Sequence, residues 1–128
     1  MKGYITNIEE ETLKNTDYRR VLYTAKNSQL VLMCIAPGDE IGEEVHELDQ
    51  FIRIESGAAT VVLNGADHVV SEDYAVVIPA GVNHNVLNTG TEDLKLYSVY
   101  APPEHKDKTV HATKMDDTEE HFDGMTSE

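Results

Sequence analysis

Short apolar runs separated by turn residues most constrain the fold of this chain. Between residues 19 and 101, runs rich in Val, Ile, Leu and Tyr alternate with Gly, Asn, Asp or Pro at close, even spacing. About eight such strands predict a sandwich or a barrel. No helical periodicity of useful length lies between them, which argues against a fold that alternates strands with helices.

Two local signals place particular strands. The dipeptide Asn64-Gly65 tolerates the positive φ angles of a tight hairpin turn, so residues 59–63 and 67–70 are predicted to pair antiparallel. Two prolines follow residue 101 and cannot continue a strand ladder, so the last strand of the barrel is predicted to end there.

The length of 128 residues fits one domain that can bury a real core. We expect a barrel over residues 28–101. Residues 1–27 form an N-terminal segment that packs on it, in which Asn7 is predicted to cap a short helix over residues 8–15. Residues 102–128 form a C-terminal extension.

The formal charge of −14 argues against nucleic acid as a partner, because so acidic a chain repels phosphate backbones. Residues 116–128 hold six acidic residues and no Lys or Arg, and we expect them to form a solvated, partly ordered tail. The single cysteine, Cys34, cannot form an internal disulfide. With no evident signal peptide and no apolar run of bilayer length, a cytoplasmic protein without membrane contact is expected.

Polar side chains fall on faces that should point into the barrel. Glu44 and His46 share one face by strand alternation, Gln50 shares a face with Ile52, and His84 begins a later strand. Burying unpaired polar groups costs several kcal/mol. Because these four side chains offer nitrogen and oxygen lone pairs with little to donate, a divalent cation would satisfy them well. The alternative is a polar pocket in which the histidines are hydrogen-bonded and no metal binds.

The surroundings of His84 resemble the second motif of the cupins. Pro79, Gly81, His84 and Asn88 match its P-x-G-x2-H-x3-N spacing, although Asp73 stands where the motif begins with glycine.

The first cupin motif, G-x5-H-x-H-x3,4-E-x6-G, is matched in spacing between Gly38 and Gly57. Its three ligand positions hold Glu44, His46 and Gln50, so a glutamate replaces the first histidine and a glutamine replaces the glutamate.

The resemblance implies an all-β fold, the double-stranded β-helix or jelly roll. It also implies a divalent metal (Zn, Mn, Fe or Ni) held by Glu44, His46, Gln50 and His84. The oxygen-rich ligand set shifts the preference slightly toward manganese or iron.

The resemblance further implies a metal-dependent enzyme in which the metal acts as a Lewis acid on a small oxygen-rich molecule, such as a sugar acid, in an isomerase or oxygenase reaction. Cupins that open the ring of unsaturated uronates most resemble this glutamine-containing set. Tyr100 and His105 are the acid or base candidates, although Tyr100 could serve only in core packing. The alternative is a cupin that binds a small molecule without catalysis.

Apolar side chains also alternate with the inward set. They should point out of the barrel, where such a surface needs a cover: a second sheet layer, the N-terminal segment or a second subunit. Cupins commonly dimerise through such a face, so the resemblance favours a homodimer. The outward residues are Phe51, Leu87, Tyr97 and Val99.

Overall fold

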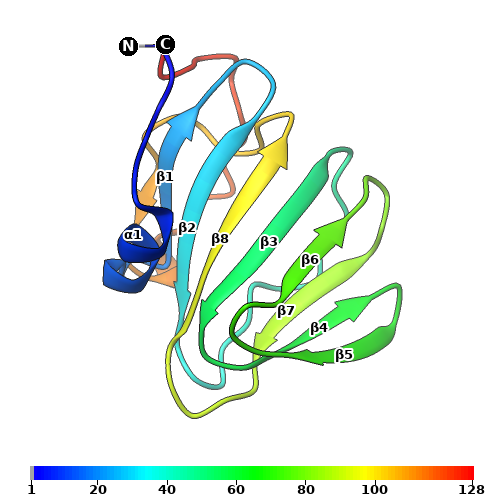
Figure 1. The fold of residues 1–128 in the computed structure, drawn as a ribbon. Coiled ribbons are helices and arrows are strands. Elements are labelled where there is room, and N and C mark those ends of the chain that lie inside the picture. The colour runs from blue at the N-terminus through cyan, green and yellow to red at the C-terminus, as the bar shows by residue number, and fades with distance from the viewer. Residues whose placement is uncertain (1) are drawn as a thin grey trace.

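Two antiparallel sheets enclose the core in the computed structural model, which describes residues 2–128 (Figure 1). The larger sheet has the strand order β6-β3-β8-β2-β1-β9 and the smaller has the order β5-β4-β7. The strands are β1 (Arg19–Thr24), β2 (Gln29–Ile35), β3 (Asp49–Ser56), β4 (Ala59–Leu63), β5 (Ala66–Val70), β6 (Ala75–Ile78), β7 (His84–Asn88), β8 (Leu94–Ala101) and β9 (Val110–His111). The helices are α1 (Ile8–Lys14) and the 3-10 helix η1 (Lys114–Asp116).

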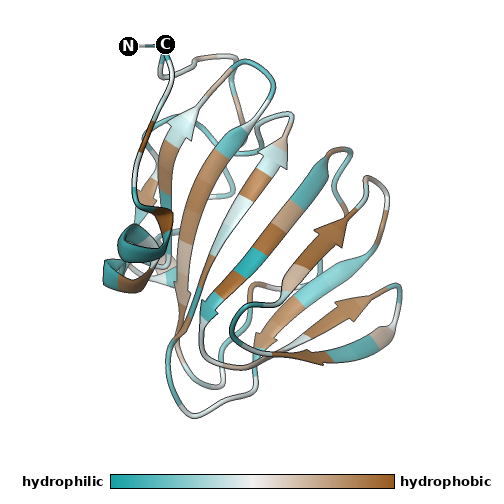
Figure 2. Cartoon of the chain, in the orientation of Figure 1, coloured by the Kyte–Doolittle hydropathy of each residue, from teal (hydrophilic) through white to brown (hydrophobic). Residues whose placement is uncertain are grey.

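Alternation along the strands builds the core between the sheets. Ile52 and Ile54 of β3 are fully buried, as are Leu94 and Leu96 of β8, and they meet Val61 of the smaller sheet. Figure 2 shows the matching alternation of hydrophobic and hydrophilic residues along β3. The mostly β, jelly-roll-type fold predicted from the sequence is therefore confirmed.

The local turn and cap predictions are also confirmed. In the β4–β5 hairpin Leu63 pairs with Ala66, and Asn64 has a φ of 48°. Asn7 caps α1 by accepting a hydrogen bond from the Glu10 amide at 3.1 Å. Favourable backbone geometry at these short stretches depends little on the rest of the chain.

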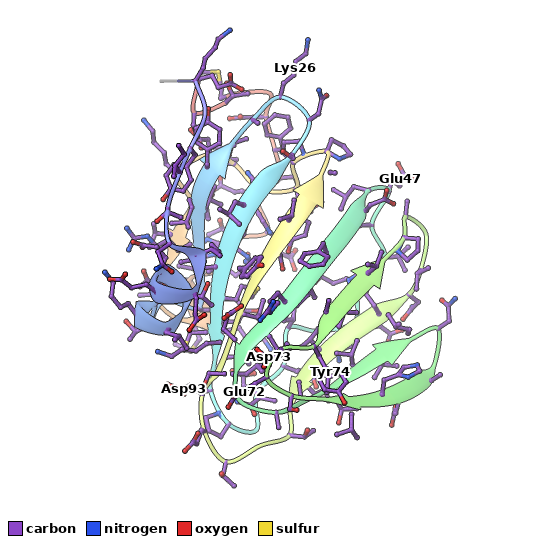
Figure 3. All side chains as sticks on the ribbon, in the orientation of Figure 1. Lys26, Glu47, Glu72, Asp73, Tyr74 and Asp93 are labelled. Atoms are coloured by element: carbon purple, nitrogen blue, oxygen red, sulfur yellow. The ribbon has the colours of Figure 1, made fainter. Side chains whose placement is uncertain are left out.

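Asp73 explains why the cupin motif begins with glycine. Its φ of 71° lies in the left-handed region, which glycine adopts freely and aspartate tolerates better than most residues. Its carboxylate accepts a hydrogen bond from Arg53 at 2.9 Å. Figure 3 labels Asp73 in the turn between β5 and β6, at the opposite end of β3 from Glu47.

Both chain ends join the larger sheet. Residues 19–24, which the sequence analysis placed in the N-terminal segment, form β1 between β2 and β9. The acidic stretch 116–128 was predicted to be a solvated, partly ordered tail. Most of it is exposed, and it is also tied to the barrel: Asp117 pairs with Arg19 at 2.9 Å, and the Ser127 amide donates to the Thr24 carbonyl at 2.9 Å. This attachment, which the sequence did not predict, has a physical cause, because Arg19 is a buried cation that requires a carboxylate.

Gly57→Ala should destabilise the protein much more than Gly81→Ala. Both glycines have positive φ, which costs an alanine about 1–2 kcal/mol. A Cβ at Gly57 would also lie 2.9 Å from the Asp93 carbonyl oxygen, whereas one at Gly81 would meet no atom within 4 Å. Such overpacking adds about 1–3 kcal/mol. Urea unfolding of both variants checks this, and equal losses of stability would contradict it.

Candidate metal centre

Glu44 and His46 lie on a loop rather than on the strand that the sequence predicted. Isolated bridges replace the strand there, one between Glu40 and Leu87 and one between Glu44 and His84. The Glu44 amide donates to the His84 carbonyl at 2.8 Å, and the His84 amide donates back at 2.9 Å. This pair of bonds fixes the loop against the start of β7, so the first ligand segment meets the second.

Three of the predicted ligands converge. Oε2 of Glu44 lies 3.0 Å from Nε2 of His46, and the rings of His46 and His84 have centroids 5.2 Å apart. Within residues 2–128, one ligand atom from each of these three residues lies within 4.8 Å of the other two. Two ligand atoms that each lie about 2.1 Å from one ion are about 3.0 Å apart when the ligand–ion–ligand angle is about 90°. The spacing therefore suits a divalent cation.

His84 is prepared to act as a ligand. Its side chain is buried, and its Nδ1 lies 2.9 Å from the Val82 carbonyl oxygen. Because a carbonyl only accepts, Nδ1 carries the proton and Nε2 keeps its lone pair. The Pro79–Gly81 corner positions this strand start, since Val82 donates to Pro79 and Gly81 donates to the His46 carbonyl. A hydrogen bond of this kind orients metal-ligating histidines.

His46 bonds to Glu44 instead of to a neutral partner. This hydrogen bond raises the pKa of His46 against the opposing effect of burial. Its other ring nitrogen, Nδ1, is buried without a partner among the described residues. Glu44 and His46 are thus joined by a hydrogen bond at the position where both would bind a cation.

Gln50, at the start of β3, leaves one oxygen unsatisfied. Its Nε2 donates to Oγ of Ser98 and to the hydroxyl of Tyr100, both at 3.2 Å. Its Oε1 is buried without a hydrogen-bond partner within residues 2–128. A buried carbonyl without a partner costs about 1–3 kcal/mol. The oxygen of Gln50 is therefore available to a ligand, and its place as the fourth metal ligand stays a prediction.

Tyr100 and His105 are uncharged side chains that lie beside His46. The Tyr100 ring lies 6.1 Å from that of His46 and 5.1 Å from that of His105. Burial raises the pKa of Tyr100 and lowers the pKa of His105 to about 3, so both are uncharged near neutral pH. Nε2 of His105 is buried without a partner in the described part of the chain. The structure thus brings His105 back to the barrel, while His68 and His121 lie at the surface.

A cavity of about 410 Å³ borders one of the predicted ligands, Glu44, and is also lined by His105, Arg19 and the C-terminal segment around Asp117. Sequence reasoning missed Arg19. Burial works to lower the pKa of Arg19, but Tyr100 and Asp117 raise it above its usual value, so the side chain stays cationic. A signal existed, because Arg19 is in phase with the inward-facing Val21 on the same strand.

Comparison with known proteins now shows the family. The family model described as the cupin domain matches residues 31–100, and the chain belongs to this family. The crystal structure of BH2720 from Bacillus halodurans is 46% identical, with a TM-score of 0.88 over 90% of this chain and 92% of that one. A structure described as a predicted oxalate decarboxylase from Thermotoga maritima is 25% identical, with a TM-score of 0.57 over 59% of this chain and 67% of that one.

The protein YrkC of Bacillus subtilis is 46% identical over 122 residues, which is 90% of this chain. The chain spans 66% of the length of YrkC. Among residues 2–128, no helix is long and apolar enough to cross a bilayer.

Replacing His105 should flatten the acid sensitivity of folding. The folded-state pKa of His105 is about 3, against 6.5 ordinarily, so between these values only the unfolded chain takes up the proton. The contribution of the neutral His105 ring to the free energy of unfolding is fully present above pH 6.5. Below pH 6.5 this contribution falls by up to about 1.4 kcal/mol per pH unit.

Denaturant unfolding of the chelated protein at about pH 7, 6 and 5 measures this. His105→Gln should lose less stability than the wild type on acidification, and His68→Gln, at an exposed site, should follow the wild type. Parallel curves for all three proteins would contradict the prediction.

Proposed function

We propose that this chain is a metal-dependent cupin enzyme acting on a small oxygen-rich molecule. The convergence of Glu44, His46 and His84 within 4.8 Å, at the edge of a cavity, carries the proposal. The unsatisfied oxygen of Gln50 adds a fourth ligand. A bound Zn, Mn, Fe or Ni ion would supply Lewis acidity toward a carbonyl or carboxylate oxygen.

The surrounding side chains have separate roles in this proposal. Tyr100 accepts a hydrogen bond from Gln50, so its own hydroxyl proton is free to be donated. The Nε2 of His105 has no partner within residues 2–128, and the ring lies 5.1 Å from that of Tyr100. Tyr100 and His105 are the proposed acid and base, and of the two His105 lines the cavity together with Glu44.

A non-catalytic binding protein is the second candidate. The same cavity of about 410 Å³ could retain a small molecule without converting it. Screening metal-loaded protein with sugar acids and dicarboxylates separates the two: turnover that requires both the metal and Tyr100 supports the enzyme, whereas saturable binding without turnover supports the binding protein.

Metal content tests the site directly. Elemental analysis of protein purified without chelator or nickel resin should find about one divalent ion per chain. His84→Ala should lose it, because the buried Nε2 is one of three converging ligands. His68→Ala removes an exposed histidine from β5 and should retain the ion. Equal metal in His84→Ala and wild type would refute the assigned site.

The proposal includes a homodimer through the outer face of the larger sheet. Phe51 and Tyr97 lie there with ring centroids 6.3 Å apart, and both are only partly buried. Helix α1 packs against β3 and β8 on this side and leaves these two rings partly uncovered.

Sedimentation analysis should find a dimer for the wild type and a monomer for the Phe51→Ser, Tyr97→Ser double variant. Loss of this apolar contact removes the burial that drives association. Val69→Ser, which changes an exposed valine of β5, should remain dimeric. A monomeric wild type would show the dimer to be wrong.

A further inference from the structure

We infer that Arg19 selects a ligand that carries a carboxylate. Until such a ligand binds, Asp117 of the C-terminal segment pairs with the Arg19 guanidinium, and the ligand carboxylate then displaces it. The inference deepens the proposed function and rests on it, because Arg19 and the proposed ligand Glu44 line one cavity.

The Arg19 guanidinium is buried and fixed in position. Its exposed fraction is 4%, and its guanidinium carbon lies 5.2 Å from the centre of the Tyr18 ring. On both sides its strand pairs with neighbours, opposite Met33 in β2 and His111 in β9. Taking a guanidinium out of water costs several kcal/mol unless a partner compensates. Such a residue at a cavity wall is costly as packing but suited to binding an anion.

The pairing of Arg19 with Asp117 is incomplete. Nη1 donates to Oδ2 of Asp117 at 2.9 Å and to Nδ1 of His111 at 3.3 Å. Nε is buried and has no hydrogen-bond partner in the described part of the chain. A guanidinium has five N–H donors in a planar fork that matches both oxygens of a carboxylate. One oxygen of Asp117 uses only part of this capacity, so a ligand carboxylate could bind more fully.

Five other acids line the cavity, and four of them have partners of their own: Asn83 donates to Glu43 at 2.8 Å, and Glu44 lies 3.0 Å from His46. Glu120 pairs with Lys106 at 2.9 Å, and Glu104 lies 2.8 Å from Nδ1 of His121. Among the described residues that line the cavity, Arg19 is the one Lys or Arg side chain. The cavity therefore joins a proposed metal site with a single fixed cation, which together suit a molecule with a carboxylate and further oxygens.

Asp117 belongs to a segment that can be displaced at low cost. Residues 117–122 contact residues 104–106 through the Phe122 amide, which donates to the Glu104 carbonyl, and through exposed ion pairs. Exposed ion pairs contribute at most about 1 kcal/mol each. The carboxylate of Asp117 itself is partly exposed. A ligand carboxylate thus competes with a neighbouring carboxylate, not with a packed core.

The test compares lactate with lactamide, in which a neutral amide replaces the carboxylate. Both are titrated calorimetrically into wild type, Asp117→Asn, Arg19→Gln and Asp123→Asn, before and after chelation, with the metal content of each sample measured. Asp123→Asn is the control, since it neutralises an exposed carboxylate of the same segment that does not line the cavity, and it leaves Arg19 paired with Asp117. Asp117→Asn keeps Arg19 in place and so reports on the arginine even if Arg19→Gln folds poorly.

We expect wild type to bind lactate at least tenfold more tightly than lactamide. Asp117→Asn should tighten lactate binding about tenfold, Asp123→Asn should leave it unchanged, and Arg19→Gln should abolish it without loss of metal. Equal binding of the two probes, binding confined to Asp117→Asn, or no effect of Asp117→Asn would overturn the inference. If the Arg19 and Asp117 pattern holds but no protein contains metal, the proposed metal function fails and the anion site stands.

Discussion

The site depends on the two backbone hydrogen bonds between Glu44 and His84. They join a loop before β3 to the start of β7, and these segments belong to the two separate cupin motifs. Other backbone bonds also hold this loop, among them those from Ile41 to Val86 and from Gly81 to His46, but the bridge is the one that joins two ligand residues directly. A ligand position off by about 1 Å would weaken metal binding. Backbone bonds hold ligands better than side-chain contacts do, because the register of the strand then fixes their separation.

The second motif could be interpreted from the sequence because each of its residues acts locally. Asn88 shows this: its amide nitrogen donates to the Ile35 and Glu92 carbonyls at 2.8 Å, and its oxygen accepts from the Gly90 amide at 3.0 Å. These bonds close the turn after β7, so the asparagine serves the fold and not the metal. Period-two alternation likewise predicts that Gln50 and Tyr100 lie on the inner face, and both are buried.

Other features of the site could not be predicted, because they join residues far apart in the sequence. Arg19 and Asp117 are separated by 98 positions, and neither local sequence pattern predicts the hydrogen bond between them. The segment around Glu44 was predicted to be a strand but is a loop. The spacing of residues in the sequence does not distinguish a strand from a loop that is held by one isolated bridge. The acidic stretch was expected to be solvated because composition reports average polarity and not a single buried partner.

The polar groups around the site divide into neutral and charged sets, and this division limits what the cavity can bind. Tyr100 and His105 are kept neutral by burial, whereas Arg19 stays cationic and Glu44 lies at a half-exposed edge. A neutral ligand oxygen could accept from the Nε of Arg19, but it would not compensate the buried charge as a carboxylate does. Arg19 and Glu44 line the same cavity, so a ligand carboxylate on Arg19 lies in the cavity that the proposed metal site borders. Under the inferred exchange, a ligand carboxylate would replace Asp117 without leaving the buried cation unpaired, whereas a neutral molecule would not, so the pairing on Arg19 would favour anions over neutral ligands.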